Sequence, residues 1–181
     1  MDALVESARQ CVQAGQLQHA ASLYSQILQL EPQHSEALNF FATQALSSGQ
    51  FSQSIELLQR ALVNSSSDAS LHKNLGLAYR GRGELPEALA AFERALEIRP
   101  AFAEAHGNIG RLLGEQGKYA EALARFDQAT LVQPGSVSAH HNRALTRLLM
   151  GNFADAWPEY EWRWQLADVR KRPGGIAWEG E

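Results

Sequence analysis

A period of 34 residues constrains this chain more than any other feature of its sequence. Glycine recurs at that spacing five times, at Gly15, Gly49, Gly83, Gly117 and Gly151. Other residue types recur with it. In residues 69–102 they are His72, Leu75, Gly76, Tyr79, Ala88, Phe92 and Pro100, and one period later they are His106, Ile109, Gly110, Leu113, Ala122, Phe126 and Pro134. Such a period is typical of architectures in which each repeat is one supersecondary unit stacked on its neighbours.

Each copy is predicted to form two helices. Apolar residues recur at spacings of three and four in two runs, Leu71, Leu75, Ala78 and Tyr79, then Leu85, Leu89, Phe92 and Leu96. The recurring glycine falls between the runs, where a helix commonly ends at positive φ. Small residues repeat on both helices and predict a close crossing between them. They are Ala8, Ala42, Gly76, Gly110 and Ala144 on the first helix, and Ala20, Ser54, Ala88, Ala122 and Ala156 on the second.

This pattern resembles the tetratricopeptide repeat (TPR), W-x2-L-G-x2-Y followed by A-x3-F and P, with His72 where tryptophan is usual. The resemblance implies an all-α fold, a right-handed superhelical solenoid of about five helix-turn-helix repeats. We expect repeats at 1–34, 35–68, 69–102, 103–136 and 137–170. Residues 171–181, with the helix-breaking run Arg170–Gly175, are expected to form a linker or the start of a further domain.

Bulk composition narrows the function classes. A formal net charge of -4 favours neither nucleic acid nor an anionic membrane as partner. The first residues lack the pattern of a signal peptide, and a single cysteine, Cys11, suits a reducing compartment, so we expect a cytoplasmic protein. No phosphate loop, nucleophile elbow or paired-carboxylate motif occurs. We therefore expect a chain that is not an enzyme and has no cofactor.

Candidate binding residues follow the same period. Asn74, Asn108 and Asn142 stand 34 residues apart on the predicted first helices, and an amide can both donate to and accept from a peptide backbone. They resemble the asparagine ladder of O-linked N-acetylglucosamine transferases, which implies a groove that holds an extended peptide. An equal alternative is that these amides hydrogen-bond between neighbouring helices. The full predicted peptide-binding set is Lys73, Asn74, Arg80, Asn108, Arg111, His141 and Asn142.

Two other patterns among these residues invite a sharper interpretation. Lys73, Asn74, Asn108 and Arg111 partly resemble the carboxylate clamp of TPR domains that bind chaperone C-termini, although such charges are more often a solvated face. His72, His106 and His140 also repeat every 34 residues. Helices of successive repeats pack about 8–10 Å apart, whereas zinc holds nitrogen ligands at about 2 Å. We therefore expect half-buried packing histidines and no metal site, and a buried inert thiol at Cys11.

All four tryptophans lie near the C-terminus, at Trp157, Trp162, Trp164 and Trp178. Trp157, Tyr160 and Trp164 share one predicted helical face, either as a cap on the last repeat or as a docking surface, since aromatic residues are enriched at interfaces. Arg163 replaces the alanine of copies two to four, which predicts that no ordinary sixth repeat follows. Gly151–Phe153, Trp157–Trp164 and Trp178–Gly180 together resemble the junction between TPR arrays and a glycosyltransferase-like domain in bacterial proteins.

The predicted function is binding of a protein or extended peptide in the concave groove. The alternative is the substrate-recruiting region of a larger glycosyltransferase-like enzyme. A third role is structural, with end repeats pairing two chains into a homodimer. Fold alone does not identify the partner.

Overall fold

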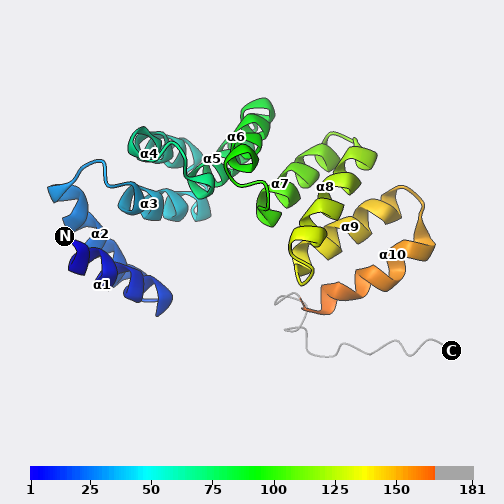
Figure 1. The fold of residues 1–181 in the computed structure, drawn as a ribbon, viewed down its shortest axis with the longest axis horizontal. Helices are drawn as coiled ribbons and strands as arrows, with labels where there is room; N and C mark the ends of the chain where they lie inside the picture. The colour runs from blue at the N-terminus through cyan, green and yellow to red at the C-terminus, as the bar shows by residue number, and fades with distance from the viewer. Residues whose placement is uncertain (166–181) are drawn as a thin grey trace. The chain divides into compact units, whose positions relative to one another are not determined.

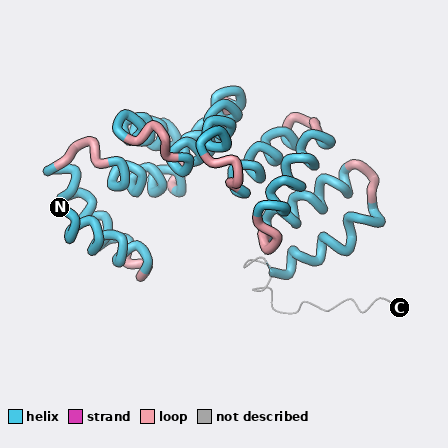
Figure 2. The backbone as a smooth tube through the Cα atoms, in the orientation of Figure 1, coloured by secondary structure: helices cyan, strands magenta, loops and turns pink. Residues whose placement is uncertain are grey.

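The computed structural model describes residues 1–165, and these residues form helices and connecting loops without a β-strand (Figures 1 and 2). Ten α-helices occur in the described part. They are α1 (Asp2–Gln13), α2 (Leu17–Leu30), α3 (Ser35–Ser47), α4 (Phe51–Asn64), α5 (Ala69–Arg82), α6 (Leu85–Ile98), α7 (Ala103–Glu115), α8 (Tyr119–Val132), α9 (Val137–Leu149) and α10 (Phe153–Tyr160). A 3₁₀-helix, η1 (Glu161–Gln165), follows α10. The predicted all-α class is confirmed.

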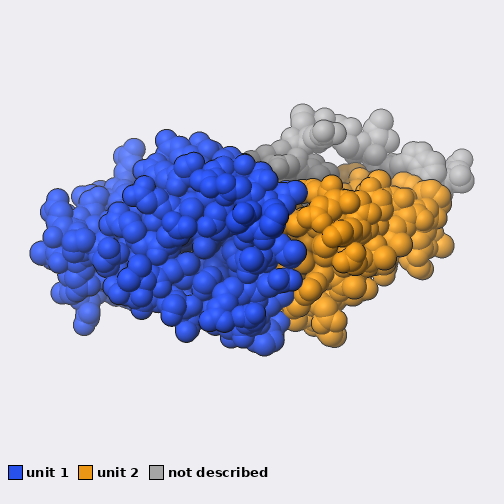
Figure 3. All heavy atoms as spheres, turned by 90° about the horizontal axis from the view of Figure 1, so that it is seen from above, with its two compact units in different colours: residues 1–100 blue, residues 101–181 orange. Residues whose placement is uncertain are grey.

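The helices fall into two compact units, residues 1–100 with α1 to α6 and residues 101–181 with α7 to α10 and η1 (Figure 3). Each predicted copy contains one pair of helices, so the 34-residue period corresponds to a helical hairpin. No described helix has both the length and the apolar character that crossing a bilayer demands. The fifth copy is expected to reach residue 170, and its last residues and the linker 171–181 lie outside the described part.

Local sequence chemistry sets the helix boundaries. The Asp68 carboxylate accepts from the backbone N–H of Ser70 at 2.8 Å and so caps α5. The Ser136 hydroxyl does the same for Ala139 at the start of α9. The recurring glycine of every copy has φ between 72° and 83°, as at Gly83 after α5. Because β-carbons crowd the backbone in this conformation, glycine is favoured there.

Two of the small residues at the predicted helix crossings, Gly76 and Gly110, lie directly against aromatic rings. A β-carbon added at Gly76 would lie 2.5 Å from the ring of Phe92, and one at Gly110 would lie 2.8 Å from Phe126. Both rings are buried. In these two hairpins, hydrogen at the glycine therefore lets the second helix place a large aromatic ring directly on the first.

The last hairpin differs from the others. The second helices α2, α4, α6 and α8 each have 14 residues, whereas α10 has 8 and contains Pro158. Proline lacks the N–H that would continue the helical hydrogen-bond pattern, and the chain tightens into η1 three residues later. The predicted long helix over this segment is therefore a short helix followed by a 3₁₀ turn.

Helices α9 and α10 lie side by side (Figure 1), and a buried carboxylate of α10 joins the two. Glu159 is 8% exposed and accepts from His140 Nδ1 at 2.6 Å, Arg143 Nε at 2.7 Å and Arg147 Nη1 at 2.7 Å. Arg143 also donates to Asp127 Oδ1 at 2.9 Å on α8. Burial raises the pKa of Glu159, but the hydrogen bonds from Arg143 and His140 outweigh it and hold the pKa below its usual value. The carboxylate is therefore ionised and fully paired at neutral pH.

Candidate functional site

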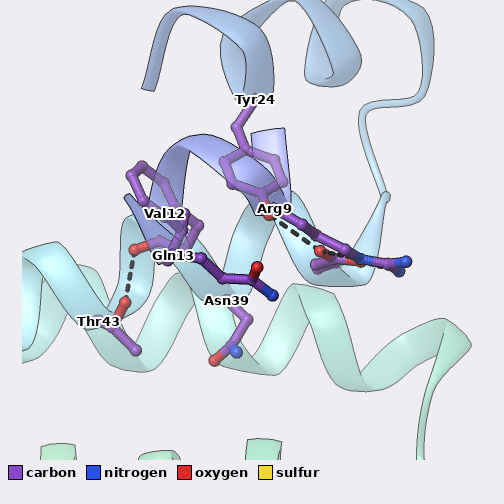
Figure 4. A pocket seen from close by; sticks show the side chains of 8 residues that line it. Arg9, Val12, Gln13, Tyr24, Asn39 and Thr43 are labelled. Carbon is purple, nitrogen blue, oxygen red and sulfur yellow. Dashed lines mark hydrogen bonds and ion pairs between the residues drawn. The ribbon is translucent and has the colours of Figure 1, made fainter. Parts of the chain in front are cut away.

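Each unit contains a pocket along its first helices. The pocket of the first unit, about 300 Å³, lies among α1, α2 and α3 (Figure 4). The pocket of the second unit, about 250 Å³, lies among α7, α8 and α9. The first is lined by Arg9, Val12, Gln13, Tyr24, Glu36, Asn39, Phe40 and Thr43, and the second by Gly110, Arg111, Gly114, Glu115, Phe126, Asn142, Leu145 and Thr146.

The two pockets are the same feature of the repeat. Arg9 and Arg111 lie three repeat lengths apart in the sequence, and so do Tyr24 and Phe126. Equivalent pairs from the following copy are Phe40 with Asn142 and Thr43 with Leu145. Each pocket thus combines an arginine, an aromatic ring and residues from the next first helix. Because two units form it independently, the repeat itself produces this pocket.

The first pocket has an ionic wall. The Glu36 carboxylate accepts from Arg9 Nε at 2.8 Å, from Arg9 Nη2 at 2.6 Å and from the Tyr24 hydroxyl at 2.9 Å. The hydrogen bond from Arg9 lowers the pKa of Glu36 below its usual value. Burial, with the hydrogen bond to Glu36, raises the pKa of Tyr24 to about 12. The charges of this wall are therefore paired with each other.

The remaining lining of the first pocket is uncharged and combines polar side chains with the apolar side chains of Val12 and Phe40. Figure 4 shows Asn39 and Thr43 projecting from α3, opposite Val12 and Gln13 of α1. The Thr43 hydroxyl donates to the Phe40 carbonyl at 2.7 Å. Amides and an aromatic ring side by side can contact the backbone and one apolar side chain of an extended segment.

One of the three asparagines of the predicted ladder, Asn74, forms the hydrogen bond between neighbouring helices that the alternative interpretation expects. Asn74 is buried in α5 and donates from Nδ2 to Asn39 Oδ1 of α3 at 2.8 Å. This amide therefore links neighbouring helices. Lys73 and Arg80, on the same helix, are half-buried and already engaged in interactions.

In the second unit, Asn108 and Asn142 are half-buried, and within residues 1–165 neither side-chain amide has a hydrogen-bond partner. Asn142 lines the second pocket together with Arg111, which is exposed and already has an interaction. These two predicted residues are thus brought together.

His141 lies elsewhere than in the second pocket. Its ring stacks on Tyr160 at 5.5 Å between centroids. Burial, and then the nearby charge of Arg163, lowers the pKa of His141. The neutral ring packs against the C-terminal segment, because α9 presents its adjacent residues to different neighbours.

The repeating histidines form hydrogen bonds in the fold. His72 Nε2 lies 2.9 Å from the Ser66 carbonyl oxygen, and His140 Nε2 lies 2.8 Å from that of Pro134. In both cases the ring contacts the turn six residues earlier, and His106 is buried. This confirms the predicted packing role. Cys11, predicted to be buried, is only partly so.

The pocket of copies one and two was not predicted from the sequence, because those copies depart from the asparagine pattern on which the predicted binding residues rested. The detectable signal was the arginine shared by Arg9 and Arg111 at one repeat position.

Comparisons with known proteins agree with the fold. Two family models, each described as tetratricopeptide repeat, match residues 41–101 and 79–156. No curated protein sequence matches the chain. Among solved structures, the thermophilic TPR protein TTC0263 of Thermus thermophilus is 23% identical with a TM-score of 0.75, and the match covers 93% of this chain and 94% of that protein.

Two further structures are similar in fold. PilF of Pseudomonas aeruginosa is 19% identical with a TM-score of 0.79, over 91% of this chain and 75% of its own. YrrB, described as a TPR protein with an unusual peptide-binding site, is 21% identical with a TM-score of 0.65, over 91% of this chain and 85% of its own. At these identities the likeness establishes a shared helical-repeat fold.

Proposed function

Since the chain carries tetratricopeptide repeats, we propose that the pockets along its first helices bind an extended segment of a partner protein or peptide. The observation that carries this proposal is the recurrence of one pocket, with the same arginine and aromatic positions, in both units. The peptide-binding site named for YrrB, which shares the fold, supports it further.

The pocket chemistry favours a peptide over a small-molecule substrate. Asn142 offers an amide without a hydrogen-bond partner in the described residues, next to the apolar side chains of Leu145 and Phe126. Amides can pair with main-chain groups, and the apolar neighbours can hold one side chain. Of the predicted set, Arg111 and Asn142 are the principal proposed contacts. Three others stay predicted contacts, namely Lys73, Arg80 and Asn108. We propose that Asn74 positions Asn39 through their hydrogen bond. His141 is not among the proposed contacts, because its ring stacks on Tyr160.

The test is affinity selection of random peptides on the full chain, followed by calorimetry of the selected peptides. We expect Asn142→Ala and Arg111→Ala to weaken binding at least tenfold each. Arg94→Ala is a matched control, because Arg94 is exposed on α6 and pairs only with Glu97 in the described part of the chain. Selected peptides that bind all three variants equally would place the binding surface elsewhere.

A role within a glycosyltransferase-like enzyme stays a prediction from sequence resemblance. Trp157–Trp164 are described, whereas Trp178–Gly180 lie outside the described residues. A longer reading frame that encodes a nucleotide-sugar domain would support that role. The cytoplasmic localisation and the homodimer also stay predictions. Sedimentation equilibrium of the chain at several concentrations tests the dimer.

A further inference from the structure

The last hairpin carries a ledge of aromatic and cationic side chains that the proposed peptide pockets do not use. We define the C-terminal ledge as Trp157, Tyr160, Arg163 and Trp164. Trp157 is 54% exposed and Trp164 is 45% exposed. The Arg163 guanidinium carbon lies 4.4 Å from the ring centre of Tyr160 and 4.5 Å from that of Trp164. These cation–π contacts, with the edge-on contact between Trp157 and Tyr160 at 5.9 Å between ring centres, join the ledge into one surface.

The ledge stands at positions that an internal repeat buries. The equivalent residues of copy two are Ile55, Leu58, Ala61 and Leu62. Ile55 is 5% exposed, and Leu58 and Ala61 have no exposure. They belong to one core cluster with residues of α5, the first helix of the next copy, namely Leu71, Leu75 and Ala78. Trp157 and Tyr160 of α10 therefore lie on the surface on which a repeat receives a following helix, and Arg163 and Trp164 of η1 extend it.

The other end of the chain is built differently. The positions of α1 that correspond to Leu71, Leu75 and Ala78 hold Ala3, Ser7 and Gln10, and all three are exposed. A polar outer face is the usual termination of a repeat array. The helix α1 of a second copy therefore lacks the apolar residues that would cover the ledge.

The ledge is also held in place before anything binds. Glu159 joins α10 to His140, Arg143 and Arg147 of α9. The ring of Trp162 stacks on His140 at 4.0 Å with an interplanar angle of 11°. Trp162 thus packs on α9 and is not part of the ledge. A surface that is ordered in advance loses less conformational entropy on binding.

The exposed area of the ledge tryptophans is small for a dimer in which the ledges of two copies of the chain face each other. With about 250 Å² for a whole tryptophan side chain, the exposed fractions of Trp157 and Trp164 leave roughly 250 Å² together. A stable dimer interface takes about 800 Å² from each partner. The two tryptophans alone are therefore too small a surface to hold two identical ledges together.

The chain's own terminal segment is a poor candidate for a helix that covers the ledge. Only residues 166–172 precede Pro173, Gly174 and Gly175, which disfavour a helix. The first helices α1, α3 and α5 have 12 to 14 residues. Seven residues would cover about half of such a face.

We propose that the C-terminal ledge docks one amphipathic helix of a partner protein, with apolar residues at the spacing of Leu71, Leu75 and Ala78. Arg163 stands where internal copies carry alanine, and its ion pair with Glu161 is long, at 3.8 Å. The partner helix therefore carries a carboxylate beside its apolar stripe, which pairs with Arg163. This site is separate from the peptide pockets, so an experiment can refute either proposal without refuting the other.

The test titrates the full chain with a defined helical probe. The probe is the α7 sequence, Ala103–Glu115, held helical by a side-chain lactam on its exposed face, with Ala105, Ile109 and Leu112 as its apolar stripe. Two of the four tryptophans, Trp157 and Trp164, belong to the ledge, so tryptophan fluorescence responds to binding there. We expect a saturable fluorescence change with micromolar affinity. Substituting Ile109→Asp and Leu112→Asp in the probe should weaken binding more than tenfold.

Variants of the chain separate the ledge from other surfaces. Trp157→Ser, checked for folding by circular dichroism, should weaken the probe more than tenfold, and Arg111→Ala in the pocket should leave it unchanged. Absent saturation, or equal affinity of wild type and Trp157→Ser, would overturn the proposal. A dimer of the chain that Trp157→Ser abolishes would also overturn it, because a second copy would then cover the ledge. A tenfold gain in probe affinity on Ile176→Ser and Trp178→Ser would overturn it too, because residues 166–181 would then cover the ledge.

Discussion

The strongest single prediction concerns Glu159, whose carboxylate holds the last hairpin together. We expect Glu159→Gln to destabilise the second unit, because it removes the negative charge between Arg143 and Arg147. Removing one partner of a buried ion pair costs about 3–5 kcal/mol. Two features lower the cost here. Glutamine keeps one accepting oxygen, and Arg143 keeps Asp127 at 2.9 Å and Thr130 at 2.8 Å.

We therefore expect a loss of about 2–3 kcal/mol in the free energy of unfolding. Urea unfolding is followed by tryptophan fluorescence, which reports the C-terminal hairpin, and by far-ultraviolet circular dichroism, which reports all helices. The fluorescence transition of Glu159→Gln should move to lower urea. Glu93→Gln is the matched control, since it removes an exposed carboxylate from the middle of α6. A loss below about 0.5 kcal/mol, equal to that of the control, would refute the reasoning.

The pH dependence of the free energy of unfolding tests the same contact. The folded state holds the pKa of Glu159 below its usual value of 4.5, so the stability it contributes is present above that value. This stability is lost as pH falls through the lower folded pKa, because the unfolded state takes up the proton first. The difference between wild type and Glu159→Gln should be constant from pH 7 to about pH 5 and shrink below that. A difference that grows on acidification would contradict the assignment.

Three further predictions test the packing and the first pocket. Gly76→Ala should destabilise relative to Gly107→Ala by about 1–3 kcal/mol in thermal unfolding, since only the Gly76 β-carbon would meet a ring; both gain the same helix propensity. A double-mutant cycle of Asn39→Ala and Asn74→Ala should give a coupling of about 1 kcal/mol, from the bond of 2.8 Å. In an ultraviolet titration one tyrosine, Tyr24, should ionise near pH 12. The stability that Tyr24 adds over Tyr24→Phe should therefore be present below its unfolded pKa of about 10 and fall as pH rises to 12.

The sequence predicted the fold well, because a short-range pattern determines it. The spacing of Gly83, of Gly76 against Phe92, and of the closing prolines indicated the helical hairpins and their crossings directly. The short α10 departs from the pattern because Pro158 breaks the helix within the last copy.

The candidate site was less predictable, because it depends on which neighbour each side chain meets. Asn74, Asn108 and Asn142 share one repeat position, yet Asn74 is buried against Asn39 whereas Asn142 lines a pocket. The environment of each asparagine depends on the residue that it faces in the neighbouring copy. For Asn74 that residue is Asn39, about one repeat earlier in the sequence. The Glu159 cluster likewise joins residues from three helices, each unremarkable in its own copy.

The Glu159 cluster draws every partner from the last two copies, between Asp127 and Glu159. At the other end, Ser7 and Gln10 of α1 bond to Ala3 and Glu6 of the same helix, and Arg9 pairs with Glu36 of copy two. Neither set of contacts uses copy three, residues 69–102. Duplication of that copy would therefore leave both sets intact and lengthen the array by one hairpin.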